Sequence, residues 1–274
     1  MTAQNSVLAV RYGHRVSSYA EAYLNYPLYG EPDGELSLDY YFWVIRDESD
    51  GGDGRVTLVD TGFSPDASAR RGRARPWTPA EALPTLGIDP DDVSAVVISH
   101  GHWDHVGNIG QFPQAQLVLA EAEYDFWTSP MGDRGQFAVH ADPAAVALLR
   151  QARRENRVTL VNRQHRLAPG VELVEVGGHT PGQLVVAVTT AQQRTVLLAS
   201  DALHFYAEAE LDRPFAVVAD LPAMYQAYDL LKDWAGQPGT DLVAGHDPLV
   251  RQRFAPHPAG PEVIDLGRPS AATA

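Results

Sequence analysis

The segment S-H-G-H-W-D-H at residues 99–105 places four side chains that can bind a metal ion close together in the chain. They are His100, His102, Asp104 and His105. Histidines two residues apart on an extended loop can point to the same side, whereas the adjacent Asp104 and His105 leave the backbone in different directions. This single loop can therefore supply ligands to two neighbouring metal ions.

Three further segments repeat one arrangement, in which an apolar run of strand length leads to a turn that presents a histidine or an aspartate. His179 lies in G-G-H-T-P-G, Asp201 in S-D-A and His246 in G-H-D, each after such a run. The run at 93–98 leads into residues 99–105 in the same way. In α/β proteins, ligands commonly bind at the carboxyl ends of strands. We therefore expect the four segments to meet at one site.

The chain contains no cysteine, so any metal must be held by imidazole and carboxylate groups. Such ligands suit zinc, the first choice, and manganese, iron or cobalt could also bind them. A two-metal centre lowers the pKa of a bridging water and stabilises the attacking and leaving oxygens. Seven side chains could complete the coordination of two divalent ions with a hydroxide between them, and Asp201 would bridge the two ions. The seven are His100, His102, Asp104, His105, His179, Asp201 and His246.

Strand-like and helix-like stretches alternate along the chain. Apolar runs bounded by turn residues predict strands at 7–10, 40–45, 56–59, 93–98, 116–119, 158–161, 171–176, 184–188, 195–199 and 241–244. Capping residues and prolines predict helices at 79–86, 120–127, 142–156 and 220–234. This pattern indicates an α/β fold in which helices cover sheets.

The domain organisation predicted from the sequence is simple. We expect one domain over residues 1–274, with a core at about 7–250 and loop or lid segments at 14–37 and 121–156. The tail from Ala255 is rich in proline, glycine and alanine, and we expect it to wrap the surface or fray.

The charge balance restricts the partners of the protein. Acidic residues outnumber basic ones by 35 to 21, and a formal net charge of -14 argues against a nucleic-acid partner. No apolar segment approaches the length of a membrane span, and the chain does not open with a basic stretch followed by an apolar run, so we expect a cytoplasmic protein with no membrane partner. Every basic residue except Lys232 is arginine, which hints at a GC-rich bacterial genome.

The motifs H-x-H-x-D-H, G-G-H-T-P-G, S-D-A and G-H-D, in this order, resemble those of the metallo-β-lactamase superfamily. The preceding V-D-T-G at 59–62 looks like its second-shell element, which implies that Asp60 supports the metal site. The resemblance implies an αββα sandwich, with two mixed sheets flanked by helices. Within the superfamily the chain is most similar to the quorum-quenching N-acyl-homoserine lactonases, a family that includes 4-pyridoxolactonase.

This family resemblance implies a dinuclear metal-dependent hydrolase that opens a small-molecule lactone or related cyclic ester. A metal-bridging hydroxide would attack the carbonyl, and Asp104 would pass a proton to the leaving group. Lactonases usually carry a tyrosine three residues after the aspartate of S-D-A, whereas this chain has His204, with Tyr206 two residues later. Either side chain is a candidate for contacting the substrate carbonyl. An N-terminal arm of this kind often packs against a partner in related lactonases, so a homodimer is one option.

Other reactions use similar ligands. Glyoxalase II hydrolyses a thioester with nearly the same core, but its C-terminal helical glutathione-binding region would not fit in the few residues after His246. A mononuclear iron oxygenase resembling the persulfide dioxygenases is a further alternative, and it would bind one iron rather than two metals. Outside the predicted ligand set, we interpret His14, His140, His165 and His257 as structural or surface histidines.

Overall fold

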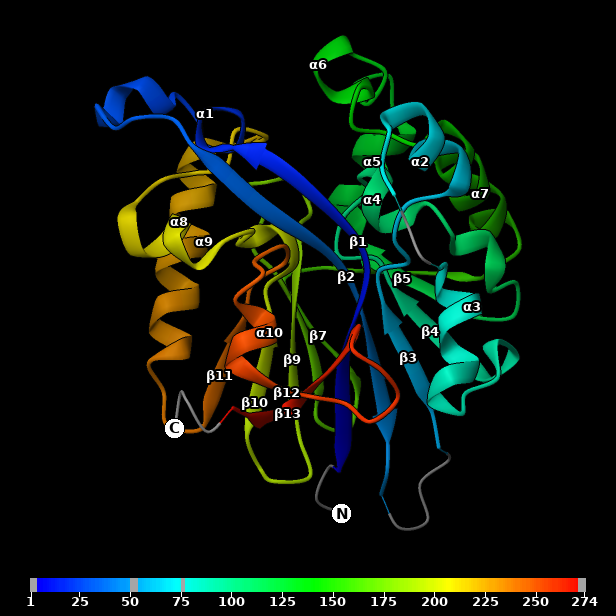
Figure 1. Cartoon of the computed structure of the whole chain (residues 1–274). Helices are drawn as coiled ribbons and strands as arrows, with labels where there is room; N and C mark the ends of the chain where they lie inside the picture. Colours follow the sequence, from blue (N-terminus) through cyan, green and yellow to red (C-terminus); the bar gives the residue numbers. More distant parts are fainter. Residues whose placement is uncertain (1–3, 50–53, 75–76, 271–274) are drawn as a thin grey trace.

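A computed structural model describes residues 4–49, 54–74 and 77–270 of the chain. At its centre two β-sheets pack face to face (Figure 1). Among the described residues the first sheet has eight strands, in the order β12 (Phe254–Pro256), β13 (Val263–Pro269), β1 (Asn5–Ser18), β2 (Glu35–Asp47), β3 (Val56–Val59), β4 (Val93–Val97), β5 (Gln116–Ala120) and β6 (Val158–Val161). The second, over the same described ranges, has five, in the order β11 (Thr240–Val243), β10 (Thr195–Leu198), β9 (Leu184–Thr189), β8 (Val171–Glu175) and β7 (Gln164–Ala168).

Both sheets are mixed. In the first sheet β3, β4, β5 and β6 run parallel to one another, whereas β1, β2 and β3 pair antiparallel. In the second sheet β10 and β11 are parallel and the remaining pairs are antiparallel. Parallel neighbours end at the same edge of a sheet, so the segments that follow β3, β4, β10 and β11 are carried to one side of the molecule.

Helices cover the outer faces of both sheets. α2, α3, α5 and α7 lie over the first sheet, and α8 and α9 lie over the second (Figure 1). The predicted caps of two helices are present, since the side chains of Asp142 and Asp220 accept hydrogen bonds from backbone N–H groups at the starts of α7 and α9. The helices are α1 (Tyr19–Ala22), α2 (Pro65–Arg71), α3 (Pro79–Ala82), α4 (Trp103–Val106), α5 (Glu121–Thr128), α6 (Gly135–Ala138), α7 (Pro143–Arg154), α8 (Tyr206–Leu211), α9 (Leu221–Ala235) and α10 (Val250–Arg253).

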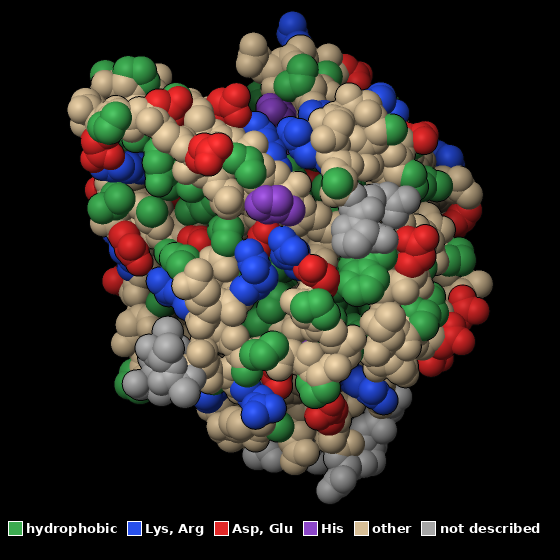
Figure 2. All heavy atoms as spheres, in the orientation of Figure 1, with side chains coloured by type: hydrophobic (Ala, Val, Ile, Leu, Met, Phe, Trp, Pro, Cys, Tyr) green, Lys and Arg blue, Asp and Glu red, His purple; other side chains and the backbone are tan. Residues whose placement is uncertain are grey.

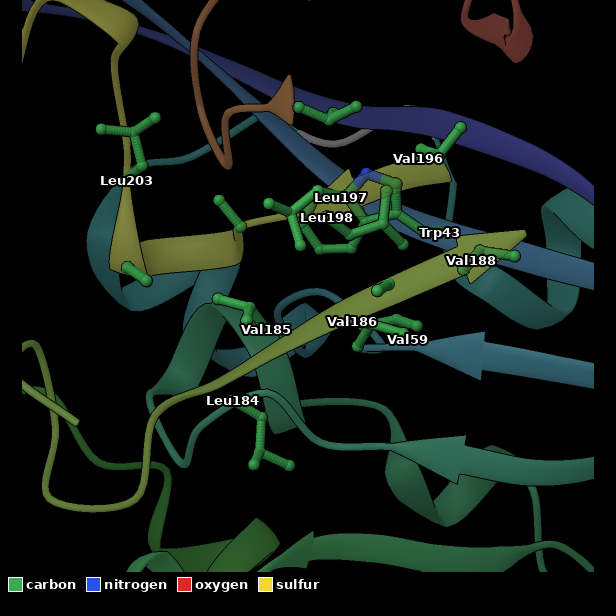
Figure 3. Close-up of a cluster of buried hydrophobic side chains, with 14 of the residues drawn as sticks. Trp43, Val59, Leu184, Val185, Val186, Val188, Val196, Leu197, Leu198 and Leu203 are labelled. Carbon is green, nitrogen blue, oxygen red and sulfur yellow. The ribbon is translucent and has the colours of Figure 1, made fainter. Parts of the chain in front are cut away.

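The space between the sheets is filled by apolar side chains from both. Trp43 of β2 and Val59 of β3 pack there with Val186 of β9 and Leu197 of β10 (Figure 3). Phe42, which alternates with Trp43 along β2, belongs instead to the core under the outer helices. Because β2 is apolar on both faces, it serves both cores. The predicted αββα sandwich of two mixed sheets flanked by helices is thus confirmed.

Two segments predicted as irregular contain strands. β1 continues to Ser18 and β2 begins at Glu35, so both ends of the predicted loop at 14–37 belong to a long hairpin, and α1 lies in the connection at its tip (Figure 1). The tail from Ala255, predicted to wrap the surface or fray, forms most of β12 and all of β13, and β13 pairs antiparallel with β1; residues 271–274 lie outside the described part. Residues 14–18 contain one apolar side chain, Val16, and it is exposed, so this stretch lacks the apolar alternation that signals a strand.

The other predicted lid segment, residues 121–156, contains α5, α6 and α7. The first and last of these helices cover the sheet, and only the short α6 stands away from the body of the molecule (Figure 1). Among the described residues, none of the helices combines the length and the apolar character that a bilayer crossing requires.

Candidate metal centre

The structure brings all the side chains predicted as metal ligands to one place. They form two groups, and the candidate ligand atoms within each group lie within 4.8 Å of one another. All are buried except Asp104, which is partly exposed. The first group is His100, His102, His179 and Asp201, and the second is Asp104, His105 and His246.

Asp201, on the short 3-10 helix η5 (Ser200–Ala202) after β10, lies between the two groups. Its Oδ2 atom is 3.3 Å from His179 Nε2. Its Oδ1 atom is 3.2 Å from His105 Nε2 and 3.0 Å from His246 Nε2. Each carboxylate oxygen of Asp201 therefore faces a different group of histidines.

The first group presents converging imidazole nitrogens. His102 Nδ1 lies 3.0 Å from His100 Nε2 and 2.9 Å from His179 Nε2. Burial lowers the pKa of all three histidines well below the ordinary value, so the rings are neutral. His179 Nδ1 lies 2.8 Å from the carbonyl oxygen of Val217, which can only accept, so its Nε2 carries a bare lone pair. Neutral imidazole nitrogens that converge in this way are suited to bind a metal cation placed between them.

The two histidines of the second group are fixed by contacts of their Nδ1 atoms, on the side of the ring away from the cluster. His246 Nδ1 donates to the carbonyl oxygen of Asp39 at 2.8 Å, and His105 Nδ1 lies 2.8 Å from Asp60 Oδ2. Asp60 also accepts from the backbone N–H of Ser99 at 2.8 Å. These contacts direct both Nε2 atoms inward, as the outer partners of metal-binding histidines do. Asp60 thus holds the His105 ring and the start of the ligand loop at Ser99 in fixed positions.

Several buried polar atoms at the centre face one another at 3.0–3.2 Å without forming a hydrogen bond. Among the described residues, His105 Nε2, Asp201 Oδ1 and His204 Nε2 make no hydrogen bond. An unpaired buried polar group costs about 1–3 kcal/mol, so three in one cluster require an explanation. Divalent cations bound by neutral imidazole and carboxylate would provide it, and the residues present fit that kind of ion.

His204 and Tyr206, the two candidates for contacting the substrate carbonyl, have different surroundings. His204 Nε2 lies 3.0 Å from Asp201 Oδ2, and the His204 ring stacks on Phe215 at a centroid distance of 3.8 Å. Burial disfavours a charged ring here, but the carboxylates of Asp201 and Glu208 raise the pKa of His204 to about 9. Tyr206 is directed elsewhere, because its hydroxyl donates to the carbonyl oxygen of Leu242 at 3.1 Å. The structure thus removes Tyr206 from the centre and leaves His204 there.

Glu123, on α5, is a residue that the motifs did not reveal. It is fully buried and accepts hydrogen bonds from Gly101 N–H at 2.7 Å, Gly182 N–H at 2.8 Å and Trp127 Nε1–H at 2.6 Å. Gly101 separates His100 from His102, and Gly182 follows the His179 turn. One carboxylate therefore ties together the two loops that carry the first group. An isolated glutamate in a predicted helix gives no sequence signal of this role.

A cavity of about 160 Å³ opens over the cluster. Trp103 and Phe215 line it together with His140, whose ring centroid is 5.2 Å from that of His102. The interpretation of His140 as a structural or surface histidine is therefore corrected: it is a pocket residue. In Figure 2 the molecular surface is hollowed between the two projecting parts of the molecule, and histidine is visible there.

An αββα sandwich with a buried cluster of histidines and aspartates at one edge, together with the family match that follows, makes the protein a metal-dependent hydrolase. The sequence profile of the Metallo-beta-lactamase superfamily matches residues 40–246, and the chain belongs to this superfamily.

Individual relatives refine this assignment toward lactonase-like hydrolases. The chain is 31% identical over 221 residues to N-acyl homoserine lactonase AiiB of Agrobacterium fabrum, covering 73% of this chain and 77% of the relative. It is 27% identical over 198 residues to an N-acyl homoserine lactonase of a Bacillus species, covering 67% and 72%. A crystal structure of an N-acyl homoserine lactone hydrolase with N-hexanoyl-L-homoserine at its metal centre shares the fold, with a TM-score of 0.72, 22% identity and coverage of 90% and 95%.

Proposed function

We propose that this protein hydrolyses a lactone or a related cyclic ester at a centre of two divalent cations, zinc being the first choice. The observation that carries the proposal is the Asp201 carboxylate, whose two oxygens face two separate groups of histidines. His100, His102 and His179 would hold one cation, and Asp104, His105 and His246 would hold the other. The similarity to the Agrobacterium lactonase supports a lactone as substrate.

When bound, the cations would supply a water of lowered pKa and positive charge beside the developing oxyanion. Ring opening adds water across the ester: a bond forms to the carbonyl carbon, the ring carbon–oxygen bond breaks, and the departing oxygen takes a proton. Asp104 is suited to carry that proton, because its side chain lines the cavity and keeps 14% of its area exposed.

His204 is proposed to orient the substrate carbonyl in place of the tyrosine of related lactonases. Its ring lines the cavity and is clamped between Phe215 on its face and Glu208 at its Nδ1 atom, 3.4 Å away. Glu208 is in turn fixed by the Tyr228 hydroxyl, which donates to it at 2.6 Å. Such fixed orientation is what a side chain needs in order to position a reacting group. Cytoplasmic location and dimer formation stay predictions.

The test combines metal analysis with a substrate screen. The purified protein, loaded with zinc or with manganese, is assayed by acid release against N-acyl homoserine lactones, other lactones, thioesters and β-lactams. Two metals per chain and turnover of lactones are expected. One iron per chain with oxygen consumption in the presence of a persulfide would contradict the proposal, and so would turnover of thioesters alone.

A further inference from the structure

The cavity over the metal centre is basic on one side, although the chain as a whole is acidic. Three arginines line it, namely Arg15, Arg71 and Arg73. Arg15 is neutralised by Glu21, at 2.8 Å. Within the described ranges Arg71 and Arg73 form no ion pair, and Figure 2 shows basic side chains gathered beside a histidine in the hollow. Two guanidinium charges in the cavity are thus without a carboxylate partner.

Arg71 is held in place at the cavity wall. Its guanidinium lies over the Trp103 ring, 4.3 Å from the centroid, and donates a hydrogen bond to the carbonyl oxygen of Val139. Trp103 stands in the chain between His102 and Asp104, so the charge of Arg71 is fixed close to the centre. A guanidinium has five N–H donors, and most of those of Arg71 are free for a ligand.

Arg73 follows two residues later, beyond the end of α2. The helix ends there because Gly72 adopts a left-handed conformation, with φ of 60°, which turns the chain and brings both arginines to the same cavity. Arg73 Nε is buried, and it makes no hydrogen bond with any described residue. The Arg73 side chain bonds to Tyr40, and its unpaired Nε–H is available to an anionic oxygen of a ligand.

The size of the cavity restricts that anion. At about 160 Å³ the space is smaller than the roughly 300–1,000 Å³ of pockets for drug-sized ligands. A small ring with one charged substituent would fit inside it, and because the cavity opens to solvent, a longer substituent would have to extend outward. A planar carboxylate also matches the fork of a guanidinium, which binds it through two parallel hydrogen bonds.

We propose that the preferred substrate is a small lactone that bears a carboxylate beside the ring, and that Arg71 and Arg73 bind this carboxylate. The proposal rests on the lactone hydrolysis proposed above and specifies its substrate class. The two arginines determine specificity by binding the part of the substrate that does not react.

The test uses a matched pair of substrates, 5-oxotetrahydrofuran-2-carboxylate and its neutral methyl ester, with the metal-loaded enzyme. Opening the lactone ring of 5-oxotetrahydrofuran-2-carboxylate adds one water and yields 2-hydroxyglutarate. We expect kcat/KM for the carboxylate to exceed that for the methyl ester by about tenfold or more. In Arg73→Gln and Arg71→Gln this ratio should fall toward one, mainly through KM. The control is Arg70→Gln, which removes an exposed charge from the same helix outside the cavity and should keep the ratio.

Binding of 2-hydroxyglutarate, measured by calorimetry on the metal-loaded enzyme, is the second measurement. It should weaken about tenfold in Arg73→Gln and stay unchanged in Arg70→Gln. Efficient turnover of the methyl ester, with no preference for the carboxylate, would overturn the carboxylate proposal and leave lactone hydrolysis standing. Failure of the enzyme to open either ring or any other lactone would refute both proposals.

Discussion

Glu123 accepts a hydrogen bond of 2.7 Å from the backbone N–H of Gly101, the residue that separates His100 from His102. The glycine is required there, because a Cβ atom at position 101 would lie 2.3 Å from the Trp127 ring. The ligand loop after β4 thus packs against α5 with no space between them, and it is locked to that helix by a buried carboxylate. The geometry of the first metal group depends on a residue that touches no metal ligand atom.

Replacing Glu123 with alanine should therefore damage stability and metal binding together. Three buried N–H donors, on Gly101, Gly182 and Trp127, would lose their acceptor, and each unpaired group costs about 1–3 kcal/mol. We expect urea denaturation to show a loss of several kcal/mol and zinc titration to show weaker binding. Glu121→Gln, an exposed change on the same helix, is the control and should change stability by less than about 0.5 kcal/mol. Wild-type stability in Glu123→Ala would contradict this role.

Asp201→Ala should empty both metal positions rather than one. Its two oxygens face the two histidine groups, so truncation removes a ligand from each. We expect plasma emission analysis to find less than half of the wild-type metal, with hydrolysis abolished. His102→Ala should remove metal from the first group only. His165→Ala on β7, outside both groups, should retain full metal content. Full metal content in Asp201→Ala would rule out the bridging assignment.

His204→Phe should lower the rate without removing metal. A phenyl ring keeps the stack on Phe215 and removes both nitrogens, so we expect kcat to fall by about 10- to 100-fold at unchanged metal content. The matched change Tyr206→Phe deletes a hydroxyl that bonds to Leu242, and should cost about 1 kcal/mol of stability with kcat preserved. Loss of metal from His204→Phe would instead make His204 a ligand, and unchanged kcat would make it pocket lining.

Glu208→Gln tests whether Glu208 acts through His204. A neutral amide beside Nδ1 should loosen the orientation of the ring and lower kcat several-fold, with little effect on KM. The diagnostic experiment is a double-mutant cycle: in the His204→Phe background, Glu208→Gln should have no further effect on kcat, since residues that act as a unit are not additive. Equal kcat losses in both backgrounds would show that Glu208 serves the fold alone.

The metal cluster was predictable from the sequence because each ligand lies in a short segment that follows an apolar strand. Asp201 and His246 come after β10 and β11, whose parallel pairing takes both to one edge. The supporting residues were not predictable in this way. Glu123 acts through long-range contacts that leave no local pattern, and Arg71 and Arg73 belong to no motif. Tyr206 lies close to the ligands in the chain, but its hydroxyl bonds to the carbonyl oxygen of Leu242 and its side chain does not line the cavity.

Removal of the metal should destabilise the fold by an amount that depends on metal concentration. In the first group the nitrogen atoms of neutral histidines lie within about 3 Å of one another. A cation that binds only the folded chain stabilises it by RT ln(1 + [M]/Kd), which is about 2.7 kcal/mol when the metal concentration is one hundred times Kd. A chelator should therefore lower the melting temperature, and added zinc should restore it. His102→Ala has lost one of the converging nitrogens, so its melting temperature should respond less to both treatments. If the chelator removes metal without lowering the melting temperature of the wild-type protein, the buried cluster is not held together by cations.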